Sequence, residues 1–241
     1  HRAALTKVYN AYARTRAEAH YDPSMDDERM LLFPLYVTSF CLYDYLADQG
    51  WFGARQILIL SASSKTAIGL ALALAGDAAA PPAIALTSAR NRETVARLGL
   101  YAAVHRYDEL GSIDAAVPTV IVDMSGNGAL LSALHERLGD NLRYCANVGV
   151  THYAENRMGP HFIAERSALF FAPGHIQKRA QDWGPGVLEK KAFAFWREAA
   201  LQSRAWLRFD RERGIPAMQA AWHRVLSGAS AADRGQIIEL R

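Results

Sequence analysis

The sequence predicts an α/β protein in which a doubly wound parallel sheet carries helices on both faces, followed by C-terminal helices and a closing strand. Short apolar runs alternate with longer helix-like stretches that end at glycines, as in successive strand–helix–strand units. The apolar runs lack a two-residue alternation of apolar and polar side chains, as expected of strands buried on both faces. The chain has 241 residues and is 51% hydrophobic, so it can enclose a sizeable core.

An arm and a helix are expected before the sheet. Residues 1–29 are polar and mixed in composition, which favours an arm with at most one short helix. Apolar side chains at helical spacing predict a helix over residues 30–48, and Gly50 and Gly53 follow its end. This helix is expected to lead the chain into the sheet.

Strands and helices then alternate. The expected strands are aliphatic or β-branched runs at residues 56–60, 83–88, 103–107, 119–124, 143–150 and 168–173. The expected helices are residues 65–76, 90–99 and 127–139, and each ends at a glycine.

The C-terminal part has a different composition. It is expected to form an aromatic-rich helix over residues 184–214 and a second helix over residues 215–228, with Pro216 near the start of the second helix and Gly228 at its end. Residues 235–241 are expected to form the closing strand. The tail aromatics are expected to pack these helices onto the sheet or onto another domain.

These elements divide the chain into three parts. They are an N-terminal arm with its helix (1–53), a Rossmann-like dinucleotide-binding domain (54–173) and a C-terminal helical segment with a closing strand (174–241). The first residue is His1 rather than methionine. We therefore expect the sequence to be the C-terminal portion of a longer protein.

Composition excludes several classes of protein. The net charge of +3 and the pI near 8.9 are spread along the chain, so we expect no nucleic-acid partner. Cys41 and Cys145 are too few for a disulfide framework or a metal cluster, and we expect two buried, reduced thiols and no metal. No uninterrupted apolar run reaches the roughly 20 residues of a membrane span, and no signal peptide is evident. A cytoplasmic protein is therefore expected.

The turn after the first strand is the candidate phosphate site. In open parallel sheets the first strand–helix turn presents free N–H groups of a helix N-terminus, which favour an anion. Here it reads SASSKTAIG, with small residues, four hydroxyls and a lysine. The candidate ligands are Ser61, Ser63, Ser64, Lys65 and Thr66. The alternative is a polar turn with a serine N-cap.

The sequence lacks the motifs of several other enzyme classes. A P-loop requires glycines where Ile59 and Ser64 stand, so an NTP hydrolase is not expected. No tyrosine precedes a lysine by four residues, and no G-x-S-x-G elbow is present. Gly69 is expected to let the helix pack closely on the strand.

The second strand favours NADP over NAD. An acid that would bind the ribose 2′-hydroxyl of NAD is expected about 20 residues after the last glycine of the turn, but no carboxylate occurs there before Glu93. Ser88 with Arg90 or Arg92 would suit a 2′-phosphate, since the planar guanidinium matches phosphate oxygens. The alternative is a helix start with exposed arginines.

Four stretches resemble a known family: FGARQILILSASSKTAIGLA, LTSARNRETVARLGLY, VDMSGNGAL and FFAPGHIQKR. They are similar to a bacterial domain-of-unknown-function family related to the zinc-independent medium-chain dehydrogenase/reductases, which include quinone oxidoreductases and enoyl reductases. The resemblance implies a Rossmann domain that binds NADPH. It also implies a barrel-like N-terminal catalytic domain, which is absent from these 241 residues. Thr66 departs from the pattern, since it stands where the middle glycine of the phosphate turn would be.

The resemblance also implies positions further along the sheet. Asp123, Ser125 and Gly126 would flank the ribose or adenosine, although Asp123 serves equally well as a partner for the start of a helix. Gly149 would lie near the nicotinamide, and His152 and Tyr153 would follow it toward the substrate. Phe170 and Phe171 are expected in the core, and Lys178 and Arg179 in solvent.

Two functions follow from these expectations. The first is an NADPH-dependent oxidoreductase domain that reduces a quinone, an enone or a carbonyl, with a small-molecule substrate and possible homodimerisation. The second is a non-catalytic Rossmann module for nucleotide sensing or protein assembly, since no acid–base pair is evident. An S-adenosylmethionine methyltransferase would need a glycine-rich first turn and an acid after the second strand, and both are missing.

Overall fold

The computed structural model describes residues 21–149 and 158–240, together with residues 3, 10, 12 and 14–18. Its centre is a six-stranded sheet in the order β3-β2-β1-β4-β5-β6, in which every neighbouring pair is parallel. This is the strand order of dinucleotide-binding folds, and it confirms the predicted class. The strands are β1 Gln56–Leu60, β2 Ala83–Thr87, β3 Ala103–Arg106, β4 Thr119–Asp123, β5 Leu142–Asn147 and β6 Ser167–Leu169.

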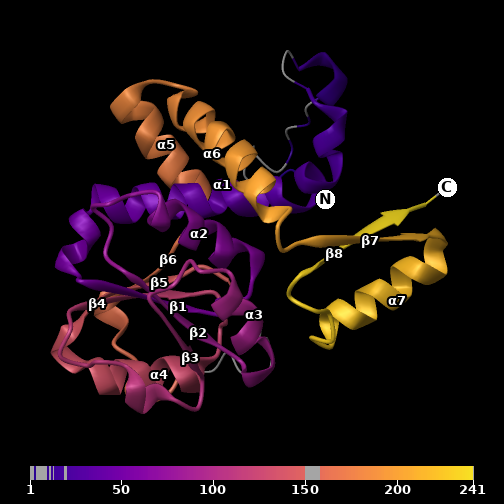
Figure 1. The fold of residues 1–241 in the computed structure, drawn as a ribbon. Coiled ribbons are helices and arrows are strands. Elements are labelled where there is room, and N and C mark those ends of the chain that lie inside the picture. The colour runs from indigo at the N-terminus through magenta and orange to yellow at the C-terminus, as the bar shows by residue number, and fades with distance from the viewer. Residues whose placement is uncertain are drawn as a thin grey trace.

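Helices cover both faces of this sheet (Figure 1). They are α1 Asp26–Asp48, α2 Lys65–Ala75, α3 Arg92–Arg97, α4 Gly128–Leu138, α5 Ala172–Trp183 and α6 Val187–Ser203. α1 and α2 pack on one face, with α5 and α6 outside them, and α4 packs on the other (Figure 1). The expected helix at 90–99 is shorter than predicted, because its first turn is a 3-10 helix at Ala89–Asn91.

The strands are buried on both faces, which explains their unbroken apolar runs. Ile57 and Ile59 pack into the core beneath α1 and α2, whereas Leu58 and Leu60 pack into the core against α4. All five residues of β1 are buried. Burial of both faces is typical of parallel sheets covered by helices, so the sheet and its helices depend on each other for stability.

α1 is the central helix of one face. The stretch Pro23–Asp48 is long and apolar enough to cross a membrane by length and composition alone, a test that buried core helices also pass. In the structure it packs against α2 and α6, and Leu32, Tyr36 and Leu42 have no exposed surface. The buried hydroxyls of Tyr36 and Ser203 share a hydrogen bond of 2.6 Å, which joins α1 to α6.

Gly69 creates the closest contact between α1 and α2. A Cβ at Gly69 would lie 2.6 Å from Ser39 Oγ and 2.6 Å from Tyr36 Cδ1, both on α1. The expectation that Gly69 lets its helix pack closely on the strand was therefore wrong. Its missing side chain instead lets α1 pack closely on α2. Ser39 Oγ donates to the carbonyls of Leu35 and Thr66, and the second of these bonds fastens α1 to the first turn of α2.

Gly69→Ala is expected to destabilise the protein by about 1–3 kcal/mol, because the added methyl overpacks the helix–helix contact. Gly76→Ala is the matched control, since a Cβ there meets only ordinary contacts, at 3.6 Å and beyond, and its backbone φ is −80°. Urea unfolding of the two variants measures the difference. Equal stabilities would show that the α1–α2 contact can accommodate a methyl group at residue 69.

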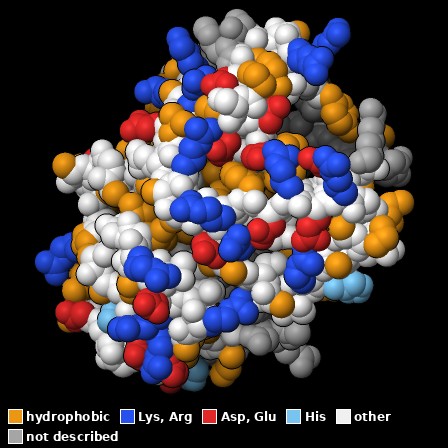
Figure 2. Space-filling model, turned by 45° about the vertical axis from the view of Figure 1, so that its right-hand side comes forward, with side chains coloured by type: hydrophobic (Ala, Val, Ile, Leu, Met, Phe, Trp, Pro, Cys, Tyr) orange, Lys and Arg blue, Asp and Glu red, His pale blue; other side chains and the backbone are white. Residues whose placement is uncertain are grey.

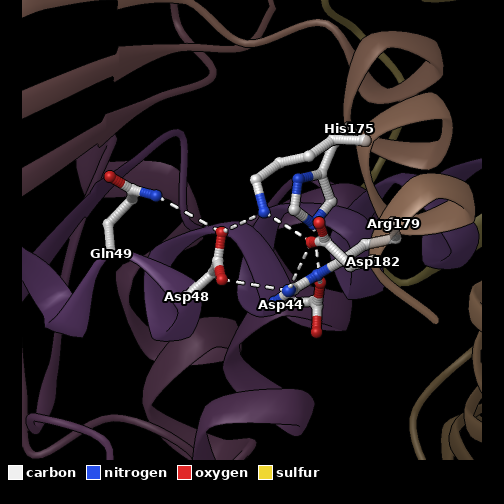
Figure 3. A network of polar contacts seen from close by, with 7 residues as sticks. Asp44, Asp48, Gln49, His175, Arg179 and Asp182 are labelled. Atoms are coloured by element: carbon white, nitrogen blue, oxygen red, sulfur yellow. Dashed lines mark hydrogen bonds and ion pairs between the residues drawn. The ribbon is translucent and has the colours of Figure 1, made fainter.

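An ion-pair network joins α1 to α5 (Figure 3). Asp44 Oδ2 lies 2.6 Å from His175 Nε2 and 2.6 Å from Arg179 Nε, and Arg179 also contacts Asp48 and Asp182. Burial alone would raise the pKa of Asp44, but the hydrogen bonds from His175 and Arg179 outweigh it and hold that pKa below its ordinary value. The expectation that Arg179 is solvated was wrong, because its side chain is 9% exposed.

Asp44→Asn is expected to cost about 3 kcal/mol at neutral pH, since it breaks a buried charge pair. The folded-state pKa of Asp44 is depressed, so its contribution is present above about pH 4 and is lost as the pH falls through the folded value. The stability gap between wild type and variant should therefore narrow in acid, as measured by denaturant unfolding against pH. Asp182→Asn, which changes a surface pair, should cost about 1 kcal/mol or less. A pH-independent gap would contradict the assignment.

The chain ends in a separate parallel unit made of β7 Arg208–Arg213, α7 Gly214–Leu226 and β8 Arg234–Glu239. The predicted helix over residues 184–214 was therefore wrong in its second half, and the predicted closing strand pairs with β7 rather than with the main sheet. Cross-strand ion pairs explain why this charged stretch forms a strand. They are Arg211–Glu239 at 3.2 Å, Arg213–Glu239 at 2.7 Å and Arg234–Asp210 at 2.9 Å.

The tail aromatics pack mainly against α1. Trp196 is buried among Phe33, Phe193 and other residues of this cluster, and Phe209 on β7 belongs to the same cluster. Trp222 on α7 is 67% exposed and does not join this cluster. The aromatic residues of the tail are therefore spread over α6, β7 and α7. For this reason, their presence in the sequence did not indicate where α6 ends.

Candidate functional site

A cleft of about 790 Å³ lies at the carboxyl ends of β1 and β2, where they meet the C-terminal unit of β7, α7 and β8. Half of the predicted site residues line it, from both turns. Because parallel strands present their carboxyl ends at one edge of a sheet, the fold brings these two turns together as expected. The predicted residues in the cleft are Ser61, Ser63, Ser64, Lys65, Ser88 and Arg90.

The first turn is held in an unusual backbone conformation. Ser61 is buried and has a φ of +55°, in the left-handed region that glycine adopts more readily. Ser64 caps α2, since its Oγ accepts the backbone N–H of Ala67 at 3.3 Å. The N-cap interpretation is thus correct for Ser64, which also lines the cleft with Ser61 and Ser63. Ser63 Oγ accepts a hydrogen bond of 3.0 Å from the Asn91 side chain, which links the two turns.

Both predicted cations in the cleft contact backbone carbonyls of the C-terminal unit. Lys65 Nζ donates to the carbonyl of Ala232 at 3.3 Å. Arg90 donates to the carbonyls of Gly228 at 2.7 Å and Ser230 at 3.1 Å. Burial lowers the pKa of Lys65, and the charge of Asp233 partly opposes this shift. The two positive charges thus face neutral oxygens across the cleft.

Two predicted ligands from these turns lie elsewhere. Arg92 is exposed at the start of α3 and does not line the cleft. Thr66 lies inside the first turn of α2, where its carbonyl accepts the hydrogen bond from Ser39, and it does not line the cleft either. Of the two alternatives for the second turn, Arg90 rather than Arg92 is placed to meet a ligand.

Asp123 closes the turn between β4 and α4. Its carboxylate accepts hydrogen bonds from the backbone N–H of Ser125 at 2.8 Å, from the Ser125 hydroxyl at 2.6 Å and from the N–H of Gly126 at 3.2 Å. Gly126 has a φ of +66°, which completes the tight turn. Asp123 is 1% exposed, and these partners of its carboxylate precede α4, whose N-cap is Asn127, so Asp123 holds the turn before the helix rather than capping it.

Asp123→Ala is expected to cost about 3 kcal/mol, because it leaves buried N–H and hydroxyl groups without their acceptor. Asp114 makes a similar but exposed turn, with Oδ1 accepting the N–H of Ala116 at 2.9 Å. Asp114→Ala should therefore cost about 1 kcal/mol or less. Thermal or denaturant unfolding compares the two variants. Equal losses would show that Asp123 does not hold the turn.

The far end of the predicted site is described in part. Gly149 lies beside Met124, whose carbonyl oxygen would be 3.6 Å from an added Cβ. Val150, His152 and Tyr153 lie outside the described residues. Phe170 is buried as expected, but the expectation for Phe171 was wrong, since it is 47% exposed where the chain leaves the edge strand β6.

Sequence reasoning missed other residues of the cleft. Thr87 at the end of β2, and Ser230 and Arg234 from the C-terminal unit, also line it. The hydroxyl oxygens of Thr87 and Ser230 are buried and have no hydrogen-bond partner among the described residues. Thr87 directly precedes the predicted ligand Ser88, so its place in the sequence could have indicated that it lines the cleft. Nothing in the sequence around Ser230 and Arg234 indicated a site, because tertiary packing alone brings these residues to the cleft.

Within the described ranges, no group of three or more His, Cys, Asp or Glu side chains is arranged to hold a metal ion. Cys41 and Cys145 are buried and free, as predicted, and burial raises the pKa of the Cys41 thiol to about 12.

The strand order defines a Rossmann-like α/β domain, and its cleft lies over the carboxyl ends of β1 and β2. The chain belongs to the family described as Protein of unknown function (DUF2855), whose model matches residues 1–231. A sequence search of curated proteins finds no match.

Solved structures share the fold at low sequence identity. CurA from Vibrio vulnificus, crystallised with NADPH, matches with a TM-score of 0.60 and 12% identity over 91% of this chain and 66% of its own. YhdH from Escherichia coli K-12, with bound NADPH, matches with a TM-score of 0.54 and 14% identity over 96% and 66%. The CurK enoyl reductase matches with a TM-score of 0.54 and 15% identity over 84% and 60%. This chain therefore spans less than two thirds of the length of these proteins.

Proposed function

We propose that this chain binds NADPH in the cleft over β1 and β2 and forms the cofactor domain of a zinc-independent oxidoreductase. The observation that supports this most directly is the set of groups around the cleft, where hydroxyls and a helix N-terminus from the first turn meet Arg90 from the second. Cations, hydroxyls and free N–H groups together suit a phosphorylated dinucleotide. CurA and YhdH, which share the fold, were crystallised with NADPH.

The residues of the cleft fit such a cofactor in charge. Lys65, Arg90 and Arg234 line it, and no lining residue that the structure describes carries a carboxylate. The left-handed backbone of Ser61 also fits, since strained turns cluster at ligand sites and Ser61 starts the turn that would approach the phosphates. The role of this chain would be to bind and orient the cofactor; when bound, the nicotinamide supplies the hydride for a quinone, an enone or a carbonyl.

A non-catalytic module for nucleotide sensing or assembly is the second candidate. One observation favours it: the titratable side chains among the described residues of the cleft are Lys65, Arg90, Arg234 and Tyr107, with no acid–base pair. Saturable NADPH binding followed by NADPH consumption with a quinone or an enone would support the oxidoreductase. Binding without consumption by the full-length protein would support the module.

We also propose a small-molecule substrate, a cytoplasmic location and a homodimer formed through an edge of the sheet. Leu169 on the edge strand β6 is 75% exposed and suits such an edge. We propose neither a nucleic acid nor a membrane as partner. On the face seen in Figure 2, Lys and Arg side chains are interspersed with Asp and Glu rather than gathered into one patch.

Arg90→Ala is expected to weaken NADPH binding by about tenfold to a hundredfold and NADH binding much less, since one charged hydrogen bond to phosphate is worth about 1.5–3 kcal/mol. Arg92→Ala is the matched control and should leave both affinities within about twofold, because Arg92 lies outside the cleft. Titration of tryptophan fluorescence with each nucleotide measures both. If the ratio of the NADPH and NADH affinities changed in Arg92→Ala but not in Arg90→Ala, the 2′-phosphate would have to bind outside the cleft.

A further inference from the structure

The two walls of the cleft hold hydrogen-bond donors that the protein itself does not use. On one wall, Thr87 Oγ1 is buried at the end of β2; on the other, Ser230 Oγ is buried in the loop between α7 and β8. Neither oxygen has a hydrogen-bond partner among the residues that the structure describes. A buried hydroxyl without a partner is unfavourable, so each such group calls for an explanation.

The same loop, residues 228–232, also accepts hydrogen bonds from two cations of the cleft, and we call it the C-terminal strap. Lys65 donates to the carbonyl of Ala232, and Arg90 donates to the carbonyls of Gly228 and Ser230. Hydrogen bonds between ionised donors and ionised acceptors are shorter and stronger than bonds to neutral oxygens. A phosphate in the cleft would therefore compete well with the strap carbonyls for both side chains.

One kind of ligand would satisfy all of these groups. Two hydroxyls and two cations surround the same cleft, and all four are donors. A ligand that satisfies them together must present several acceptor oxygens and negative charge, which describes a phosphate group. The strap is 138 residues from Arg90 in the sequence, yet it places Ser230 at this position by tertiary packing alone.

We propose that the C-terminal strap closes the phosphate site of the dinucleotide, with Ser230 and Thr87 as specificity-determining ligands that donate their hydroxyls to phosphate oxygens. This inference rests on the proposed function, because it assumes that the ligand of the cleft is a phosphorylated dinucleotide. It goes beyond the serine-rich first turn and Arg90, since it assigns phosphate contacts to Thr87 at the end of β2 and to Ser230 in the C-terminal unit.

The test compares three variants by titration with NADPH and with NADH. Ser230→Ala and Thr87→Val each remove one hydroxyl and nearly preserve the shape of the residue. Each should weaken NADPH binding by about tenfold, as expected for a hydrogen bond to a charged group. Ser227→Ala is the control, because Ser227 is exposed, lies one turn away at the end of α7 and does not line the cleft. It should leave both affinities unchanged.

The two nucleotides distinguish which phosphate the strap contacts. Loss of NADPH affinity with NADH affinity retained identifies the 2′-phosphate, and equal losses identify the pyrophosphate; both results support the proposal. Unchanged affinities in both Ser230→Ala and Thr87→Val overturn it while leaving the proposed function intact. Failure of the wild-type protein to bind NADPH or NADH overturns the proposed function and this inference together.

A second measurement separates ligand contact from a structural role. Because the Thr87 hydroxyl has no hydrogen-bond partner among the described residues, Thr87→Val should keep or raise the melting temperature of the protein measured without ligand. The melting temperature should then rise less on addition of NADPH than it does for the wild type. A variant that melts several degrees lower without ligand would show that the hydroxyl is already satisfied in the fold, which contradicts the proposal.

Discussion

The burial of β1 on both faces is the constraint on which the structure depends. Ile57 and Ile59 need the α1–α2 layer, and Leu58 and Leu60 need α4, so neither layer is dispensable. The strand has β2 on one side and β4 on the other, which puts its carboxyl end at the switch in strand order. Polar side chains that follow such a strand have only that edge of the sheet to occupy. The hydroxyls of the first turn therefore reach the cleft because of the apolar strand before them.

The groups that hold the fold and those that face the cleft share the same short segments. Ser64 both caps α2 and lines the cleft, and Ser39 joins α1 to the carbonyl of Thr66 within the first turn of that helix. Gly69 lies one turn further along the helix and sets the distance between α1 and α2. The position of the first turn thus depends on helix packing as much as on the sheet, and a substitution on α1 can alter the cleft without touching it.

Local patterns in the sequence predicted the sheet and half of the site. Aliphatic runs and terminal glycines were sufficient for the alternating strands and helices of a parallel sheet and for the turns that carry Lys65 and Arg90, because these features act over a few residues. The rest depends on partners distant in the chain. The run RFDRER looks helical in composition, and only pairing with β8 makes it a strand. Arg179 looked solvated because Asp44 lies 135 residues away, and Ser230 carried no signal for the same reason.

The separation of 138 residues between Arg90 and Gly228 has a kinetic consequence. Except for the β1–β4 pair, contacts within the main sheet join strands that follow each other in the sequence, whereas the cleft closes only when a chain segment from far downstream returns to β2. Contacts of such high sequence separation form late, because the entropy of closing a long loop is lost before the contact stabilises it. A partly folded chain with a complete sheet would thus present an open, polar edge. Competence to hold a ligand would be acquired late in folding.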